Sequence, residues 1–456
     1  MGHDAARLAE FVVGAAPPAA ALERAAAAVR DTVGVILAGA VEPAARAVQV
    51  MALEEGRGPC GILGTTGRTG ASWAALANGV AAHALDFDDM CFVSLAHPSC
   101  TLLPASLAAC ELARVGGRAL LEGYVVGFEL ECRLGAVMNP RHYHERGWHC
   151  TSTIGTMGAA AAAARILGLT PSEAGHALGI AASSACGLKE NLGSMVKPLH
   201  AGLAARNGIM AARLAQRGYT ASARAIDGPQ GFLAAMDAEH DTLDRACVDL
   251  DRHWEILATG ITVKRYPSCA ATHPTIDLLL DMREREGLTA ADVESVEVEV
   301  DSMTPRLLIY DRPAAGLEAK FSMPLCAAAA IADGHVGIDT FEIERVAAPQ
   351  LQTLMAKISM RVNTAFDTEA PLSHARVTVR LRDGRVLRGS ADGARGYPAH
   401  PVSDEQLLAK FSECARRTLS PSSVERAWLT LSRIETIVDA SALSDLLTPA
   451  VPMTVS

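Results

Sequence analysis

Residues 155–167 read GTMGAAAAAARIL, with six consecutive alanines at 159–164. Alanine has the highest intrinsic helix propensity. Small side chains on every face also let neighbouring helices approach from all sides, so such a helix is buried rather than amphipathic. The stretch therefore predicts a buried helix over about 156–167, inside a domain of closely packed helices.

Helical patterns extend outward from this stretch, from residue 5 to about 260. Apolar residues recur three and four positions apart over 22–40 and 101–112. Thr170, Pro171 and Glu173 form a capping box with proline at the first helical position, which marks a helix start. A second capping box begins at Ser403 and predicts helical structure to about residue 447.

The periodicity changes from helical to extended after Lys264. Val296, Val298 and Val300 alternate with polar residues and predict a strand over 293–300, with Val293 on the opposite face. Residues 358–362 repeat the alternation, and 377–386, with Asp-Gly at 383–384, predict a β-hairpin. A helix is expected between them, over 323–332.

These patterns predict a mainly α fold with an α+β part. We expect a large, discontinuous all-helical domain made of residues 1–262 and 400–456. A smaller α+β lid domain of residues 265–398 is inserted into it.

Composition excludes several classes of protein. Half of the 456 residues are hydrophobic, which rules out an intrinsically disordered chain. The net charge of −10 argues against nucleic acid or an anionic membrane as a partner. None of the eleven cysteines forms a CxxC pair, and the first residues lack the pattern of a signal peptide. We expect a cytoplasmic protein with reduced thiols and no membrane span.

Ionisable residues gather in four islands within this alanine-rich sequence. The first holds His83, Asp86, Asp88 and Asp89, followed by His97. Its carboxylates repel one another unless cations or protons balance them. His97 precedes a proline at a predicted helix start, where backbone N–H groups favour an anion. A solvated acidic loop is the alternative interpretation.

The second island is HYHERGWH, residues 142–149. A metal hydrolase using His142, His144 and His149 is one alternative, but Gly147 interrupts the helix that would align these side chains, and HExxH is absent. A catalytic histidine before the alanine-rich helix is the preferred interpretation, with His149 the first candidate.

The remaining two islands carry lysines. Lys197 lies in the apolar segment GSMVKPLHAG, residues 193–202, where a buried charge needs an anion nearby. Lys264 begins KRYPSC at the predicted domain boundary, and clefts between domains are favoured ligand sites. A surface loop is the alternative for each. GxGxxG, P-loop and GxSxG motifs are absent, which argues against nucleotide chemistry and serine hydrolysis.

Taken together and in order, the islands resemble the MmgE/PrpD family over residues 30–411. The segments that carry the resemblance are NGVAAHALDFDD (78–89), AHPS (96–99), GWHCTSTIGTMGAAAAAA (147–164), MVKPLHAGLAARNG (195–208), KRYPSCAATHPTID (264–277), KFSMPLCAAAAIADG (320–334) and RGYPAHPVSDEQLLAKF (395–411). The resemblance implies a cofactor-independent enzyme, usually a homodimer, with a helical domain and a smaller lid. Known members include 2-methylcitrate dehydratase, cis-aconitate decarboxylase and iminodisuccinate epimerase, which act on small di- or tricarboxylates.

By position, the resemblance implies an active site without metal. Its catalytic residues would be Asp86, His97, His149, Lys197 and Lys264, and its substrate contacts Met90, His200, Arg265, Cys269, His273 and Leu325. Lysine ammonium groups can hold carboxylates, and histidines can move protons near neutral pH.

Three positions depart from the decarboxylase pattern. Met90, Cys269 and Leu325 stand where the decarboxylase has threonine, histidine and tyrosine. We therefore expect a hydro-lyase in preference to a decarboxylase. His149 or His97 would remove a proton α to a carboxylate, and Lys197 and Lys264 would stabilise the intermediate. An epimerase using the same intermediate and a non-catalytic carboxylate-binding protein are the alternatives.

Overall fold

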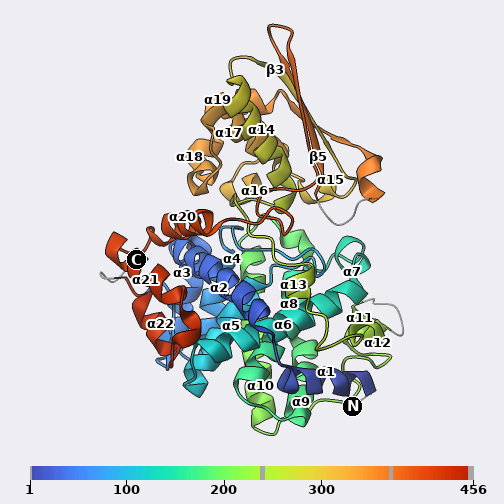
Figure 1. Cartoon of the computed structure of the whole chain (residues 1–456), viewed down its shortest axis with the longest axis vertical. Coiled ribbons are helices and arrows are strands. Elements are labelled where there is room, and N and C mark those ends of the chain that lie inside the picture. Colours follow the sequence, from blue (N-terminus) through green and yellow to red (C-terminus); the bar gives the residue numbers. More distant parts are fainter. Residues whose placement is uncertain (1–2, 237–241, 369–372, 450–456) are drawn as a thin grey trace.

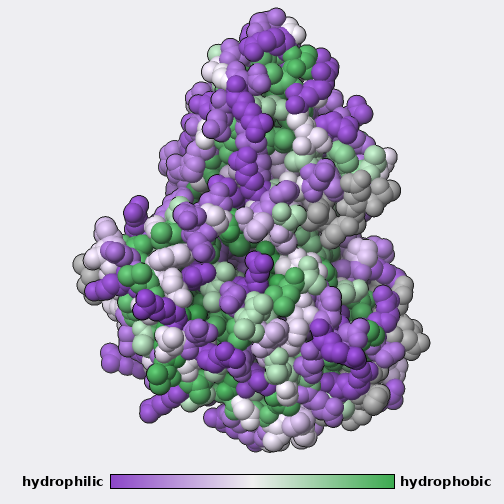
Figure 2. All heavy atoms as spheres, in the orientation of Figure 1, coloured by the Kyte–Doolittle hydropathy of each residue, from purple (hydrophilic) through white to green (hydrophobic). Residues whose placement is uncertain are grey.

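The computed structural model describes residues 3–236, 242–368 and 373–449. Figure 1 shows a broad helical body below a narrower unit that contains the sheet. The predicted fold class, mainly α with an α+β part, is confirmed. In the space-filling view hydrophobic residues gather around the waist where the two units meet (Figure 2).

The body is built from helices on both sides of the inserted segment. These are α1 (His3–Gly14), α2 (Ala19–Gly39), α3 (Pro43–Glu54), α4 (Ala71–His83), α5 (Ser99–Ala113), α6 (Gly117–Met138), α7 (Arg141–His144), α8 (Cys150–Ile166), α9 (Pro171–Ser184), α10 (Val196–Gln216), α11 (Phe232–Ala235), α12 (Thr242–Ala246), α13 (Glu255–Ala258), α20 (Asp404–Ala415), α21 (Pro421–Leu431) and α22 (Ser441–Leu446). Helices α20 and α21 contact each other and pack against α2, which lies near the other end of the sequence.

The alanine-rich helix α8 lies at the centre of the body. It contacts α5, α6, α9 and α10, and the side chains of residues 159–164 are fully buried. The helix begins at Cys150, earlier than the sequence predicts. Hydroxyl side chains near its start bond inside the helix, as the Thr156 Oγ1 does to the Ser152 carbonyl at 2.7 Å, and so do not interrupt it.

Helices α4 and α10 approach each other closely at two glycines. A Cβ atom on Gly79 would lie 2.7 Å from the Cα of Gly202, a distance that only glycine allows. This contact brings His83, at the end of α4, next to Lys197 and His200, at the start of α10.

The upper unit is a four-stranded sheet covered by helices. Its elements are α14 (His273–Glu286), β3 (Val293–Val300), α15 (Thr304–Leu307), α16 (Gly316–Ala319), α17 (Met323–Asp333), α18 (Ile343–Val346), α19 (Pro349–Met355), β4 (Ile358–Val362), β5 (Ala375–Leu381) and β6 (Val386–Ala391). The strand order is β4-β3-β5-β6, in which β3 and β4 are parallel and the other pairs antiparallel. The predicted hairpin is confirmed as β5 and β6.

Two local expectations were wrong. Val293 is buried together with Val296, because the register shifts between Val293 and Ser295 and turns Val293 to the core face. The body is also not purely helical as predicted, since Cys60–Gly61 (β1) pairs with Arg68–Thr69 (β2). The buried carboxylate of Glu111 accepts from the Gly61 N–H and fixes that segment.

Among the described residues no single helix is both long enough and apolar enough to cross a membrane. The segments Ala5–Gly14 and Ala19–Gly39 reach that length and apolar character only when taken together, and the chain bends by 85° between them. The two largest hydrophobic clusters lie one in the body and one in the upper unit, which we call the lid. We propose that residues 1–262 and 400–456 form one folding unit and residues 265–398 the other.

Candidate functional site

Asp86 is the centre of a buried charge cluster. Its Oδ1 accepts hydrogen bonds from the Nζ of Lys197 at 2.8 Å and of Lys264 at 2.6 Å. Burial acts to raise the pKa of this carboxyl, but the two ammonium groups outweigh burial and hold the pKa well below its usual 3.8. One buried carboxylate therefore holds two lysines from distant segments.

The backbone around Asp86 is shaped for this contact. Asp86 has a φ of +52°, in the left-handed region that non-glycine residues seldom occupy. Lys264 also donates to the Asp86 carbonyl at 3.0 Å, which helps to hold the turn after α4. Asp86 thus has both a strained backbone conformation and two ion-pair partners.

A row of four imidazoles runs beside the charge cluster. The ring centres of His97 and His83 are 4.6 Å apart, those of His83 and His149 are 5.9 Å apart, and those of His149 and His200 are 5.3 Å apart. The two histidines proposed as bases thus lie on either side of His83. Burial is the main cause that lowers the pKa of all four, to about 3 for His83 and to about 4 for His200. The row is therefore neutral near pH 7 and can accept protons.

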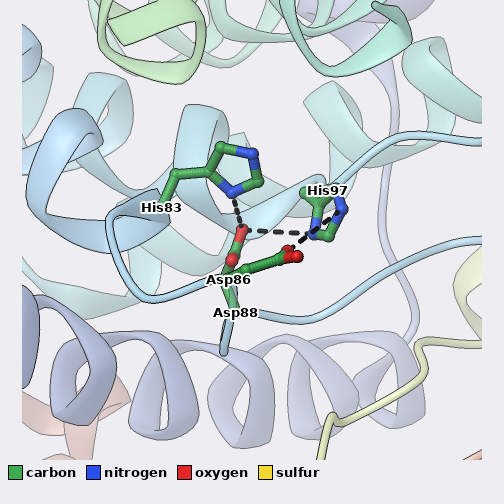
Figure 3. A group of neighbouring side chains, drawn as sticks. All are labelled: His83, Asp86, Asp88 and His97. Atoms are coloured by element: carbon green, nitrogen blue, oxygen red, sulfur yellow. Dashed lines mark hydrogen bonds and ion pairs between the residues drawn. The ribbon is translucent and has the colours of Figure 1, made fainter. Parts of the chain in front are cut away.

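Asp88 connects two members of this row (Figure 3). Its Oδ2 lies 2.8 Å from the Nδ1 of His83 and 3.4 Å from the Nδ1 of His97. Burial acts to raise the pKa of Asp88, but the two histidines outweigh it and the pKa is lowered well below 3.8. Asp88 is a charged acceptor that orients the imidazoles.

The third carboxyl of the acidic island has a different environment. Asp89 accepts hydrogen bonds from the backbone N–H and hydroxyl of Ser99, at the start of α5. Burial raises its pKa to about 8. Asp89 is thus protonated near pH 7, which removes one of the three charges that would otherwise repel one another.

A small cavity lies between the body and the lid. It is lined by His83, Ala84, Asp86, Gly193, Ser194, Lys197 and Pro198 from the body and by Leu317, Lys320 and Phe321 from the lid. Its volume is about 10 Å³, close to the space that one water molecule needs. A di- or tricarboxylate requires the lid or these side chains to move apart.

Two family models match successive parts of the chain. The model of the MmgE/PrpD N-terminal domain matches residues 6–243, and the model of the MmgE/PrpD C-terminal domain matches residues 266–436. The chain belongs to the MmgE/PrpD family. The predicted resemblance is thereby confirmed.

Several relatives of this MmgE/PrpD chain are named cis-aconitate decarboxylase. The Mus musculus protein is 30% identical over 389 residues, covering 82% of this chain and 78% of its own. The Homo sapiens protein is 29% identical and covers 82% and 79%. A protein of Aspergillus terreus is 26% identical over 454 residues, covering 94% and 92%. The relatives are therefore enzymes that act on a carboxylate.

In this MmgE/PrpD chain the five residues expected to be catalytic lie close together. Asp86, Lys197 and Lys264 share hydrogen bonds, and His97 and His149 flank His83. Of the expected substrate contacts, His200 lies beside His149, with 3.1 Å between their Nδ1 atoms. Cys269 is connected to the site by a backbone hydrogen bond: its N–H donates to the carbonyl of Lys320 at 3.0 Å.

None of the six expected substrate contacts is among the residues that line the cavity. Met90 pairs with Thr262 through the backbone and packs against Phe92 and Tyr397. Leu325 is fully buried in the lid core, and the His273 Nε2 lies 3.2 Å from the Ser268 carbonyl. Arg265 is half-buried at the boundary between lid and body.

One group of side chains in the described part of the chain has the ligand types of a metal site. Ligand atoms of His83, Asp86, Asp88 and His97 lie within 4.8 Å of one another (Figure 3). The charge balance does not favour a divalent cation there, because two ammonium groups already neutralise Asp86 at 2.6 and 2.8 Å. His142, His144 and His149 form no such group within the described ranges.

The interpretation of the sequence left out three residues of the site. His83 and Asp88 were part of the acidic island, but sequence spacing does not indicate that His83 lies between His97 and His149. Lys320 begins the segment KFSMPLC and is buried at the cavity. A lysine ahead of an apolar run was the signal that could have revealed it.

Proposed function

We propose that this protein is a cofactor-independent lyase that acts on a small di- or tricarboxylate by transferring a proton at a carbon α to a carboxylate. The observation that carries the proposal is the pairing of a buried lysine cluster with a row of neutral imidazoles. Cations stabilise the charge that develops on a carboxylate when its α-carbon loses a proton. A neutral imidazole next to that carbon can accept the proton.

His149 and His97 are the proposed bases. Loss of contact with water lowers the pKa of each, so each is in the basic, neutral form at pH 7. Lys197 and Lys264 are the proposed stabilisers of the intermediate, with Asp86 holding them in place.

The relatives change the order of preference among reactions. Their names support decarboxylation, and the expected preference for a hydro-lyase has no support among them. In a decarboxylation the C–C bond to the departing carboxylate breaks, its electron pair enters the neighbouring conjugated system, and a protonated side chain supplies a proton to carbon. The histidines are neutral near pH 7, so a lysine ammonium group would supply this proton.

Dehydration is the second candidate, and a specific observation favours it. Met90, Cys269 and Leu325 replace three polar groups of the decarboxylase pattern, and Leu325 is fully buried among apolar residues. Without these three polar groups, the site is less suited to bind the substrate of the decarboxylases. A β-hydroxyl would leave as water after proton removal, in place of carbon dioxide.

One experiment separates these outcomes. The purified protein is incubated in heavy water with a panel of hydroxylated and unsaturated di- and tricarboxylates, and proton NMR follows exchange and products. Loss of carbon dioxide indicates decarboxylation, a new double bond with the carbon skeleton retained indicates dehydration, and exchange with inversion indicates epimerisation. Absence of both exchange and product with every compound would contradict the proposal and leave carboxylate binding as the alternative.

We further propose that the protein is a cytoplasmic homodimer, as the family resemblance implies. Sedimentation equilibrium of the purified protein tests the dimer, and a monomer at micromolar concentration contradicts it.

A further inference from the structure

Lys320 is a buried cation whose partners are not carboxylates. It follows α16 in the lid and is 4% exposed. Its Nζ donates to the Leu85 carbonyl at 2.8 Å and to the Pro267 carbonyl at 2.9 Å, and it lies 4.4 Å from the centre of the Phe341 ring. Lys320 thus connects the body, at the residue before Asp86, with the base of the lid.

The other two buried lysines of the described ranges have a different environment. Lys197 and Lys264 both bond the Asp86 carboxylate, whereas Lys320 has no carboxylate within ion-pair distance there. An ammonium group has three N–H donors, and the two carbonyls use two of them. One donor and a full positive charge are left for another acceptor.

Lys320 decides the net charge of the site. Lys197 and Lys264 are offset by Asp86 and Asp88, while the four histidines of the row are neutral near pH 7. Without Lys320 the cluster has no net charge with which to attract an anion. With Lys320, which lines the same cavity as Asp86 and Lys197, the site carries one uncompensated positive charge.

We propose that Lys320 binds a carboxylate of the substrate at the boundary between body and lid. The proposal rests on the proposed function only in taking the substrate to be a polycarboxylate. Burial lowers the pKa of Lys320 to about 8, which leaves it mostly protonated at pH 7, and a bound carboxylate would raise that pKa again.

Binding of propane-1,2,3-tricarboxylate, measured by calorimetry at pH 7, tests this role. The probe has neither a hydroxyl group nor a double bond, so it binds without reacting. Two variants separate charge from structure: Lys320→Gln removes the charge but keeps N–H donors for the two carbonyls, and Lys320→Met removes both. Both are expected to raise the dissociation constant of the probe about 10- to 100-fold, as for the loss of a charged hydrogen bond.

Lys357→Met is the matched control. Lys357 is a half-buried lid lysine that, like Lys320, donates to a backbone carbonyl, that of Val293 at 2.6 Å, but it does not line the cavity. Its loss is expected to leave the dissociation constant of the probe unchanged. A wild-type value for Lys320→Gln, with weakening only in Lys320→Met, would show that Lys320 merely ties the lid to the body and would overturn the proposal.

The readout also distinguishes this proposal from the lyase proposal. If the wild-type protein binds the probe through Lys320 but turns over no compound of the panel, the binding role stands and the lyase proposal fails. If the wild-type protein turns over a substrate and Lys320→Gln has an unchanged dissociation constant for the probe and an unchanged KM, the role of Lys320 is refuted and the lyase proposal stands.

Discussion

The Nδ1 atoms of His149 and His200 lie 3.1 Å apart, within hydrogen-bonding distance. One imidazole must donate and the other accept, so the two rings hold opposite tautomers at these nitrogens. His149 comes from the N-terminus of α8 and His200 from the first turns of α10, both inside the body. His200 therefore positions the proposed base by fixing its tautomer and ring orientation.

Substitution of these two histidines is expected to have unequal effects. His149→Ala should lower kcat about 10²- to 10⁴-fold, as is typical when a general acid or base is lost. His200→Ala should lower kcat less, and His200→Asn should restore part of the loss because an amide can still pair with the Nδ1 of His149. Steady-state kinetics of the three variants check this, with exposed His253→Ala as a control. Equal activity of His149→Ala and wild type would remove His149 from the mechanism.

Lys197→Met should act mainly on substrate binding. Lys264 would still neutralise Asp86, so we expect the fold to be retained while KM rises about 10- to 100-fold and kcat falls less. Kinetics with thermal melting as the folding control measure both effects. A variant with unchanged KM would show that Lys197 serves only to hold Asp86.

The protonated Asp89 predicts a specific dependence of stability on pH. Its carboxyl keeps a proton up to about pH 8 in the native state but loses it near 3.9 when unfolded, so the native state binds more protons between these values. The contribution of Asp89 to the free energy of unfolding therefore falls as the pH rises from about 4 to 8. Asp89→Asn cannot ionise, so its Tm relative to wild type should increase steadily from pH 5 to pH 8. A difference in Tm that does not vary with pH would contradict the assignment.

The close contact of α4 and α10 should not tolerate an added methyl group. A Cβ atom on Gly202 would lie 2.5 Å from the Leu76 carbonyl oxygen, so Gly202→Ala should lower the free energy of unfolding by about 1–3 kcal/mol and reduce activity by moving α10. Gly14→Ala is the control, because a Cβ there meets nothing within 4 Å. Chemical denaturation of both variants provides the comparison, and equal stability would show that the helices can separate without cost.

Activity should survive removal of metal ions. The two lysines beside Asp86 leave His83, Asp88 and His97 poorly suited to a divalent cation. Dialysis against a chelator, followed by elemental analysis and an activity assay, tests this expectation. Stoichiometric zinc or iron that restores lost turnover would instead make His83, Asp86, Asp88 and His97 a metal centre.

The secondary structure follows closely from local sequence. The capping boxes at Thr170 and Ser403 form as predicted, and the Asp-Gly turn joins β5 to β6. These features depend on residues within a few positions of one another, which is why spacing alone reveals them. The bulge near Val293 forms against the distant strand β5, and Glu111, 50 positions from Gly61, fixes the segment of β1 and β2, so spacing missed both.

The sequence by itself determined which chemical groups this protein has: carboxylates, imidazoles and lysines isolated in apolar segments that can bury them. Only the tertiary structure decided how those groups pair. Lys197 and Lys264 are 111 and 178 positions from Asp86, yet both bond the same carboxylate oxygen. A buried charge must find an opposite charge within a few ångströms, and the close crossing of α4 with α10 and the seating of the lid on the body supply those partners here. The same packing leaves Lys320 without a carboxylate of its own.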